Sequence, residues 1–137
     1  TLIEYAAFYG SIQIFNNLKM NNAELKKSLW NYAIHGQNSE IIQYLEEINI
    51  EPEDKSYKEC LIESIKCHHN NITQYLQDNY LFNHSENNFI DLWIYCLKYY
   101  NFMIMNDTFI NESSFYYICK YDYYLFAEAL LMETNVD

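Results

Sequence analysis

The sequence contains no arginine, only two glycines and one proline, and no long uninterrupted apolar run. Its eight lysines stand against nineteen acidic residues, which gives a net charge of −11. Nucleic-acid-binding proteins neutralise phosphates with clustered Lys and Arg, and anionic membranes attract the same residues. No apolar run approaches the roughly 20 residues of a membrane-spanning helix. We therefore expect neither a nucleic-acid partner nor a membrane partner.

Although short of turn residues, the chain is half apolar and contains 15 tyrosines. A domain of this length buries roughly two-thirds of its unfolded surface. We therefore expect residues 1–137 to form a single folded domain. The cysteines lie inside helical patterns and favour reduced thiols in a reducing compartment over disulfides. They are Cys60, Cys67, Cys96 and Cys119.

The sequence repeats itself. Residues 1–18 align without a gap with residues 28–45, which places Tyr5 over Tyr32 and Ala6 over Ala33. Fainter copies follow, and the repeats lie near residues 1–27, 28–55, 56–87, 88–112 and 113–137. A unit of this size cannot bury its apolar face alone and stacks on copies of itself. Such stacks present a long surface to another macromolecule.

Local signals within the copies are helical. Residues 1–4 and 56–59 each match the capping box, in which a Ser or Thr and a Glu three residues later satisfy each other's backbone amides. Apolar residues then recur at helical spacing, and the small Ala6 and Ala33 allow two helices to approach closely. Asparagines in the left-handed conformation are expected to end three helices, at Asn22, Asn49 and Asn79. The fold class predicted is all-α.

The first copy reads Thr-Leu-Ile-Glu-Tyr-Ala-Ala-Phe-Tyr-Gly-Ser-Ile-Gln-Ile-Phe-Asn-Asn-Leu. It resembles the ankyrin repeat, because Ala6, Ala7 and Gly10 match its core and Ile14 and Phe15 occupy its paired aliphatic position. The copies lack the Pro and His of the family signature, so the resemblance is to the divergent, Asn- and Tyr-rich ankyrin-like domains of unknown function from large expanded families. It implies a solenoid of about five stacked helix pairs. The chain ends as one such repeat runs into the next, and no signal peptide opens it, so we expect a cytoplasmic excerpt of a longer solenoid.

In ankyrin-like stacks the first helix of each pair lines a concave face that contacts the partner. The resemblance assigns twelve partner-binding positions: Tyr5, Phe8, Tyr9, Tyr32, His35, Lys66, Tyr95, Lys98, Tyr99, Tyr117, Lys120 and Tyr121. Glu63, Gly36 and Cys67 occupy the same columns of the alignment. Exposed aromatics are favoured interface anchors. The lysines suit an acidic or phenolic surface, whereas the net charge suits a neutral or basic partner. The alternative is that the tyrosines are partly buried packing residues.

Four residues invite metal or small-molecule chemistry: Cys60, Cys67, His68 and His69. Against a zinc site, no Cys-x-x-Cys pair exists, and the two histidines align with the turn residues Gly10 and Ser11. A Cys/His nucleophile has no evident group to orient its base and no glycine-rich oxyanion loop. We therefore expect no enzyme, no cofactor and no metal.

The leading hypothesis is a protein–protein interaction module whose partner is another protein. Two alternatives stay open: a metal- or small-molecule-binding protein that uses the cysteine and histidine cluster, and a purely structural spacer in a longer solenoid.

Overall fold

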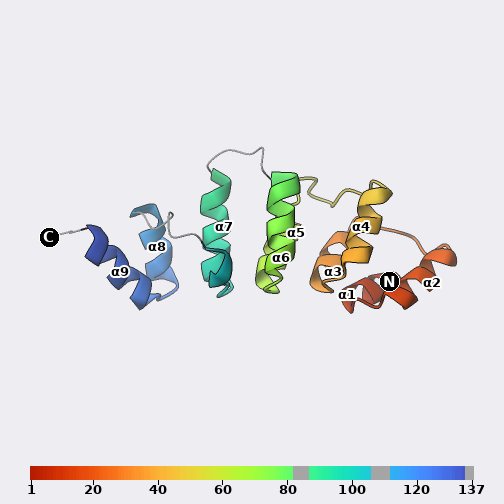
Figure 1. Cartoon of the computed structure of the whole chain (residues 1–137), viewed down its shortest axis with the longest axis horizontal. Helices are drawn as coiled ribbons and strands as arrows, with labels where there is room; N and C mark the ends of the chain where they lie inside the picture. Colours follow the sequence, from red (N-terminus) through yellow and green to blue (C-terminus); the bar gives the residue numbers. More distant parts are fainter. Residues whose placement is uncertain (82–86, 106–111, 135–137) are drawn as a thin grey trace. The chain divides into compact units, whose positions relative to one another are not determined.

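The computed structural model describes residues 1–81, 87–105 and 112–134. It describes the side chains of residues 1–80, 92–105 and 114–132. These residues form helices and turns and contain no strand, which confirms the all-α expectation (Figure 1). The chain divides into two compact units, unit 1 (Thr1–Asn83) and unit 2 (His84–Asp137).

Unit 1 consists of three successive helix pairs and a terminal π-helical turn. The elements are α1 (Leu2–Phe8), α2 (Ile12–Met20), α3 (Leu29–His35), α4 (Ser39–Glu47), α5 (Lys58–Lys66), α6 (Asn70–Leu76) and η1 (Gln77–Leu81). Each first helix contacts the second helix of its own pair, and α3 contacts both α1 and α5 (Figure 1). The first helices of the three pairs therefore form one row.

The two expected capping boxes have different outcomes. At α1 the box is present, because the Thr1 side chain accepts the Glu4 amide and the Glu4 side chain reaches back to the cap. The box over residues 56–59 is wrong. The Glu59 amide donates to the carboxylate of Asp54 at 3.1 Å, and no side-chain bond caps α5 at Tyr57. A carboxylate is the stronger acceptor for a helix N-terminal amide, since it also interacts favourably with the helix dipole.

A left-handed residue separates the first helix of each copy from the next element of the chain. The positions with positive φ include Gly10, Gln37, His68, Tyr100 and Asp122. Each lies five residues after the equivalent position of its copy, which is held by Tyr5, Tyr32, Glu63, Tyr95 and Tyr117. Asn22 and Asn49 also have positive φ, as expected for helix ends. The expectation for Asn79 is wrong, because the chain continues through η1 and the Asn79 side chain donates to the Tyr75 carbonyl at 2.8 Å.

The core of unit 1 is built from side chains of both the first and the second helices of the pairs. Phe15, Trp30 and Leu45 are fully buried. Ala6 and Ala33 are also buried, on the contacting helices α1 and α3. Their burial on contacting helices is compatible with the close contact that the sequence predicts at these small residues.

Unit 2 contains three helices and a short 3₁₀ turn among its described residues. The elements are α7 (Asn87–Lys98), η2 (Phe102–Ile104), α8 (Glu112–Lys120) and α9 (Tyr124–Thr134). Contacts join α7 to α8 and α8 to α9. Its core is a cluster of buried side chains: Trp93, Leu97, Ile118 and Leu130. Across the described parts of both units, none of the helices combines the length and the apolarity required to cross a membrane.

Candidate functional site

The aromatic face of α1 and α3 comprises Tyr5, Phe8, Tyr9, Tyr32 and His35. Helical spacing places the first three on one stripe of α1, and the repeat offset places the other two beside them on α3. Tyr5 is 65% exposed, Tyr9 73% and Tyr32 37%. These tyrosines therefore present ring surface to solvent.

Phe8 is the half-buried centre of this face. Its ring meets Tyr9 edge-on at 5.0 Å and Tyr32 at 6.4 Å between centroids. It lies parallel to the His35 imidazole at 3.9 Å and 12°. These contacts are typical of aromatic pairs and fix the ring orientations across the two helices.

The tyrosines predicted to bind a partner in unit 2 are more enclosed. Tyr95, Tyr99, Tyr117 and Tyr121 are all half-buried, and Tyr117 and Tyr121 pack against the unit 2 core. The Lys98 ammonium lies 5.1 Å above the Tyr99 ring. The exposed Lys120 ammonium lies within 6 Å of several tyrosine rings, 5.9 Å from Tyr117 and 5.7 Å from Tyr121. Packing contacts within unit 2 thus account for part of the recurrence of tyrosine at these positions.

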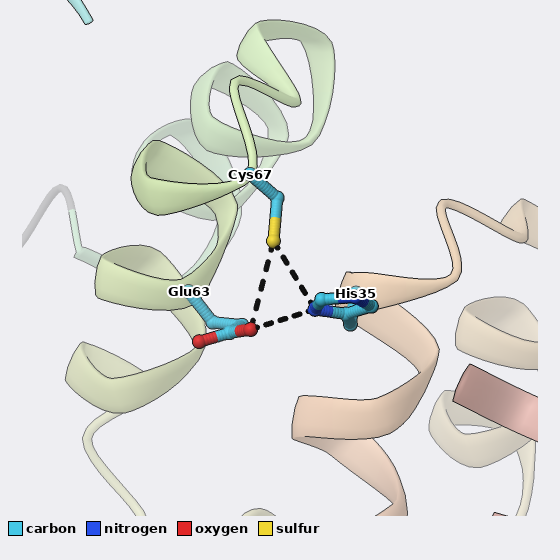
Figure 2. Close-up of side chains that lie close together, drawn as sticks. All are labelled: His35, Glu63 and Cys67. Carbon is cyan, nitrogen blue, oxygen red and sulfur yellow. Dashed lines mark hydrogen bonds and ion pairs between the residues drawn. The ribbon is translucent and has the colours of Figure 1, made fainter. Parts of the chain in front are cut away.

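Beside the aromatic face, three polar side chains converge (Figure 2). His35 ends α3, while Glu63 and Cys67 lie four residues apart on one side of α5 and its C-cap. The His35 Nδ1 atom is 2.9 Å from Glu63 Oε1 and 3.3 Å from Cys67 Sγ. Cys67 Sγ lies 3.5 Å from the same Glu63 oxygen. We call this set the His–Glu–Cys cluster.

The cluster is half-buried, and this shapes its electrostatics. The His35 side chain is 34% exposed and the Glu63 side chain 21%. Burial alone would raise the pKa of Glu63, but hydrogen bonds from His35 and Lys66 outweigh it and lower that pKa. Burial, followed by the negative charge of Glu63, raises the pKa of the Cys67 thiol to about 11. The carboxylate is therefore charged at neutral pH while the thiol keeps its proton.

The geometry does not suit nucleophilic catalysis. In a Cys–His pair the base takes the thiol proton on one ring nitrogen, and a third group orients the ring through the other. Here Glu63 and Cys67 both face Nδ1 of His35. The raised pKa of Cys67 also opposes thiolate formation. What the arrangement offers is three donor atoms directed at one point, which is the requirement of a cation.

The donor set considered from the sequence is wrong as a set. Cys60 is buried, its thiol donates to Asn31 Oδ1 at 3.6 Å, and burial raises its pKa to about 12. His68 is exposed at the left-handed turn, and the His69 Nε2 atom lies 3.0 Å from the His35 carbonyl oxygen. In the described part of the chain, the one group of three or more potential ligands within reach of each other is the His–Glu–Cys cluster.

The sequence did contain a signal for this cluster. His35, Glu63 and Cys67 all occupy columns of the repeat alignment, and two of them have the i, i+4 spacing of one helix face. Proximity along the chain favours Cys60, Cys67, His68 and His69 instead, whereas residues on one face of neighbouring copies come together only when the copies stack.

Comparisons with known proteins do not identify the chain. No protein-family model matches it, and no curated protein or solved structure gives a significant match. The ankyrin-like resemblance therefore stays a prediction that depends on the repeat residues.

Proposed function

We propose that the chain is a protein–protein interaction module that binds its partner on the aromatic face of α1 and α3. The observation that carries this proposal is the exposure of Tyr5 and Tyr9, at 65% and 73%, next to Tyr32 on the adjoining helix. Large aromatic side chains lose little conformational entropy on binding and bury much area, so they are favoured as anchors. While these tyrosine rings remain in water, they add no packing contacts to the helices that carry them.

The partner proposed is a protein segment that carries Lys or Arg side chains among apolar ones. The net charge of −11 attracts a basic partner over long range. Tyrosine ring faces also attract cations at close range. Lys66, which shares its alignment column with Phe8 and His35, already bonds to Glu63 at 3.0 Å and so offers less attraction to an acidic segment.

The architecture that belongs to this proposal is an ankyrin-like solenoid of about five helix pairs, without catalytic residues, in a reducing cytoplasmic setting. Its support is the left-handed residue found at the same register of all five copies, from Gly10 to Asp122. The thiols agree with such a setting, because all four cysteines are free.

Selection from a displayed peptide library tests the proposal. The full chain serves as bait, and the selected peptides are then measured against Tyr5→Ala, Tyr9→Ala and Tyr124→Ala. Tyr124, on α9, is the matched control because it is 67% exposed but lies outside the aromatic face. Peptides rich in Lys or Arg should lose about 30-fold in affinity, or about 2 kcal/mol, with the α1 variants. The control variant should bind as the parent does.

Two results would overturn the proposal. One is a set of peptides that bind the parent and the α1 variants equally, which would place the interface elsewhere. The other is a library that yields no specific binder, which would favour a structural spacer.

A further inference from the structure

The His–Glu–Cys cluster brings one nitrogen, one oxygen and one sulfur donor together from two helices of unit 1. We infer that His35, Glu63 and Cys67 bind a zinc ion. The site shares His35 with the aromatic face, but its donor atoms do not include the exposed tyrosine anchors, so zinc binding and partner binding can be tested separately.

The distances between donors match a tetrahedral site closely. With Zn–N, Zn–O and Zn–S bonds of about 2.05, 2.1 and 2.3 Å, tetrahedral angles separate the donors by about 3.4 Å for N···O and about 3.6 Å for S···N and S···O. The structure has 2.9 Å for His35 to Glu63, 3.3 Å for Cys67 to His35 and 3.5 Å for Cys67 to Glu63. An ion thus requires each pair to open by about half an ångström or less.

The surroundings hold the donors in place. The His35 ring is stacked on Phe8 at 3.9 Å, which fixes the direction of its Nδ1 atom. The Lys66 ammonium bonds to the second oxygen of Glu63 at 3.0 Å, which leaves the first oxygen directed at the cluster. Supporting contacts of this kind orient ligands in metal sites and contribute to affinity.

The ligand chemistry selects the class of metal. Magnesium and calcium prefer all-oxygen sites, whereas a thiolate with an imidazole suits zinc. Three protein ligands leave a fourth tetrahedral position, and the partial exposure of the cluster gives that position access to water or to a side chain of a partner. Binding removes the thiol proton of Cys67, which passes to the buffer.

Zinc competition with a chromophoric chelator on the full 137-residue chain tests this site. We expect one zinc ion per chain. Cys67→Ser, His35→Gln and Glu63→Gln should each weaken the affinity at least about tenfold, since each removes a ligand. Cobalt(II) should give a thiolate charge-transfer band that Cys67→Ser abolishes.

Two variants serve as matched controls. Cys119→Ser removes an exposed thiol outside the cluster, and His68→Gln removes an exposed histidine next to Cys67. Glutamine is suited to the left-handed turn at position 68, because Gln37 adopts the same conformation at the equivalent turn. Both controls, and Tyr5→Ala, should bind zinc as the parent does.

Circular dichroism of each variant separates loss of a ligand from loss of the fold, and Glu63→Gln preserves the shape of the side chain. The inference is overturned if the folded parent binds no zinc in the competition. It is equally overturned if the cluster variants retain parental affinity, or if Cys119→Ser loses as much as Cys67→Ser.

Discussion

Gly36 is the residue on which the approach of α1 and α3 most depends. A Cβ atom at this position would lie 2.1 Å from the Ala7 carbonyl oxygen and 2.9 Å from the Gly10 amide nitrogen. Both neighbours are backbone atoms, which cannot rotate away as a side chain would. A single added methyl group therefore has to push the two helices apart.

We expect Gly36→Ala to destabilise the chain by on the order of 1–3 kcal/mol, as overpacking does in other cores. Denaturant unfolding followed by circular dichroism measures this change. The control is Gln13→Ala, on the exposed side of α2, which should stay within about 0.5 kcal/mol of the parent. If Gly36→Ala unfolds at the parental midpoint, α1 and α3 do not approach as closely as described.

At the scale of single residues, the sequence predicts the features that depend on spacing along the chain. The small residues Ala6 and Ala33 were predicted at a close contact, and both are buried on contacting helices. The role of Gly36 was not predicted, because the alignment placed it in a column of partner-binding positions. Only the distance from this position, at the end of α3, to the Ala7 carbonyl oxygen of α1 shows that Gly36 is a packing contact.

At the scale of elements, a cluster of aromatic side chains joins α3, the start of α5, α6 and the π-helical turn η1. Tyr57 and Tyr80 stack at 3.9 Å and 15°, and Trp30 meets Tyr57 edge-on at 5.1 Å. The hydroxyls of Tyr75 and Tyr80 donate to Glu46 Oε1 at 2.7 and 2.6 Å. Tyr80 thus holds the turn to α4, and Tyr75 holds α6 to the same carboxylate.

This cluster predicts a loss of stability at alkaline pH. Burial raises the pKa of Tyr80 above its ordinary value of 10.0, and the bond to Glu46 and its charge raise it further. The pKa of Tyr75 is raised by burial and Glu46, and that of Tyr57 by burial and Glu51. Since the unfolded chain then loses tyrosine protons first, the contribution of these tyrosines to the free energy of unfolding is constant below about pH 10 and falls as the pH rises above it.

Denaturant unfolding at about pH 8 and at about pH 11 measures this fall. Tyr80→Phe removes the ionisable hydroxyl and should make the fall smaller, whereas the exposed Tyr124→Phe should leave it as in the parent. An equal fall in all three proteins would assign the alkaline transition to other groups.

The elements themselves were largely predictable, because helical periodicity and turn positions are local signals. Residues 121–126, Tyr-Asp-Tyr-Tyr-Leu-Phe, have a β-like composition. The structure has a left-handed turn at Asp122 followed by α9, without a strand. The π-helical turn was not predicted, since Asn79 resembles the asparagines that end the earlier second helices. Its geometry depends on Tyr75, Tyr80 and Glu46, which meet only after α4 and α6 have packed.

For the molecule as a whole, the candidate site shows which features the sequence predicts and which it does not. The columns of the alignment contained His35, Glu63 and Cys67, so their common face was predicted. Their convergence within 3.5 Å depends on the rotation of α3 relative to α5 and on the His35 rotamer held by Phe8. Neither is encoded in a local pattern, and spacing along the chain therefore favours the neighbouring Cys and His residues.

The whole molecule also carries a net charge of −11, and a compact state of this charge repels itself. Salt weakens that repulsion, because the screening length falls from about 30 Å at 0.01 M to about 8 Å at 0.15 M. We therefore expect the thermal unfolding midpoint to rise as sodium chloride increases over this range, measured by circular dichroism. Glu53→Lys, at an exposed position, lowers the net negative charge by two units and should make the rise smaller. A midpoint that falls with salt would show that the ion pairs of the chain, such as Lys66 with Glu63, outweigh its net repulsion.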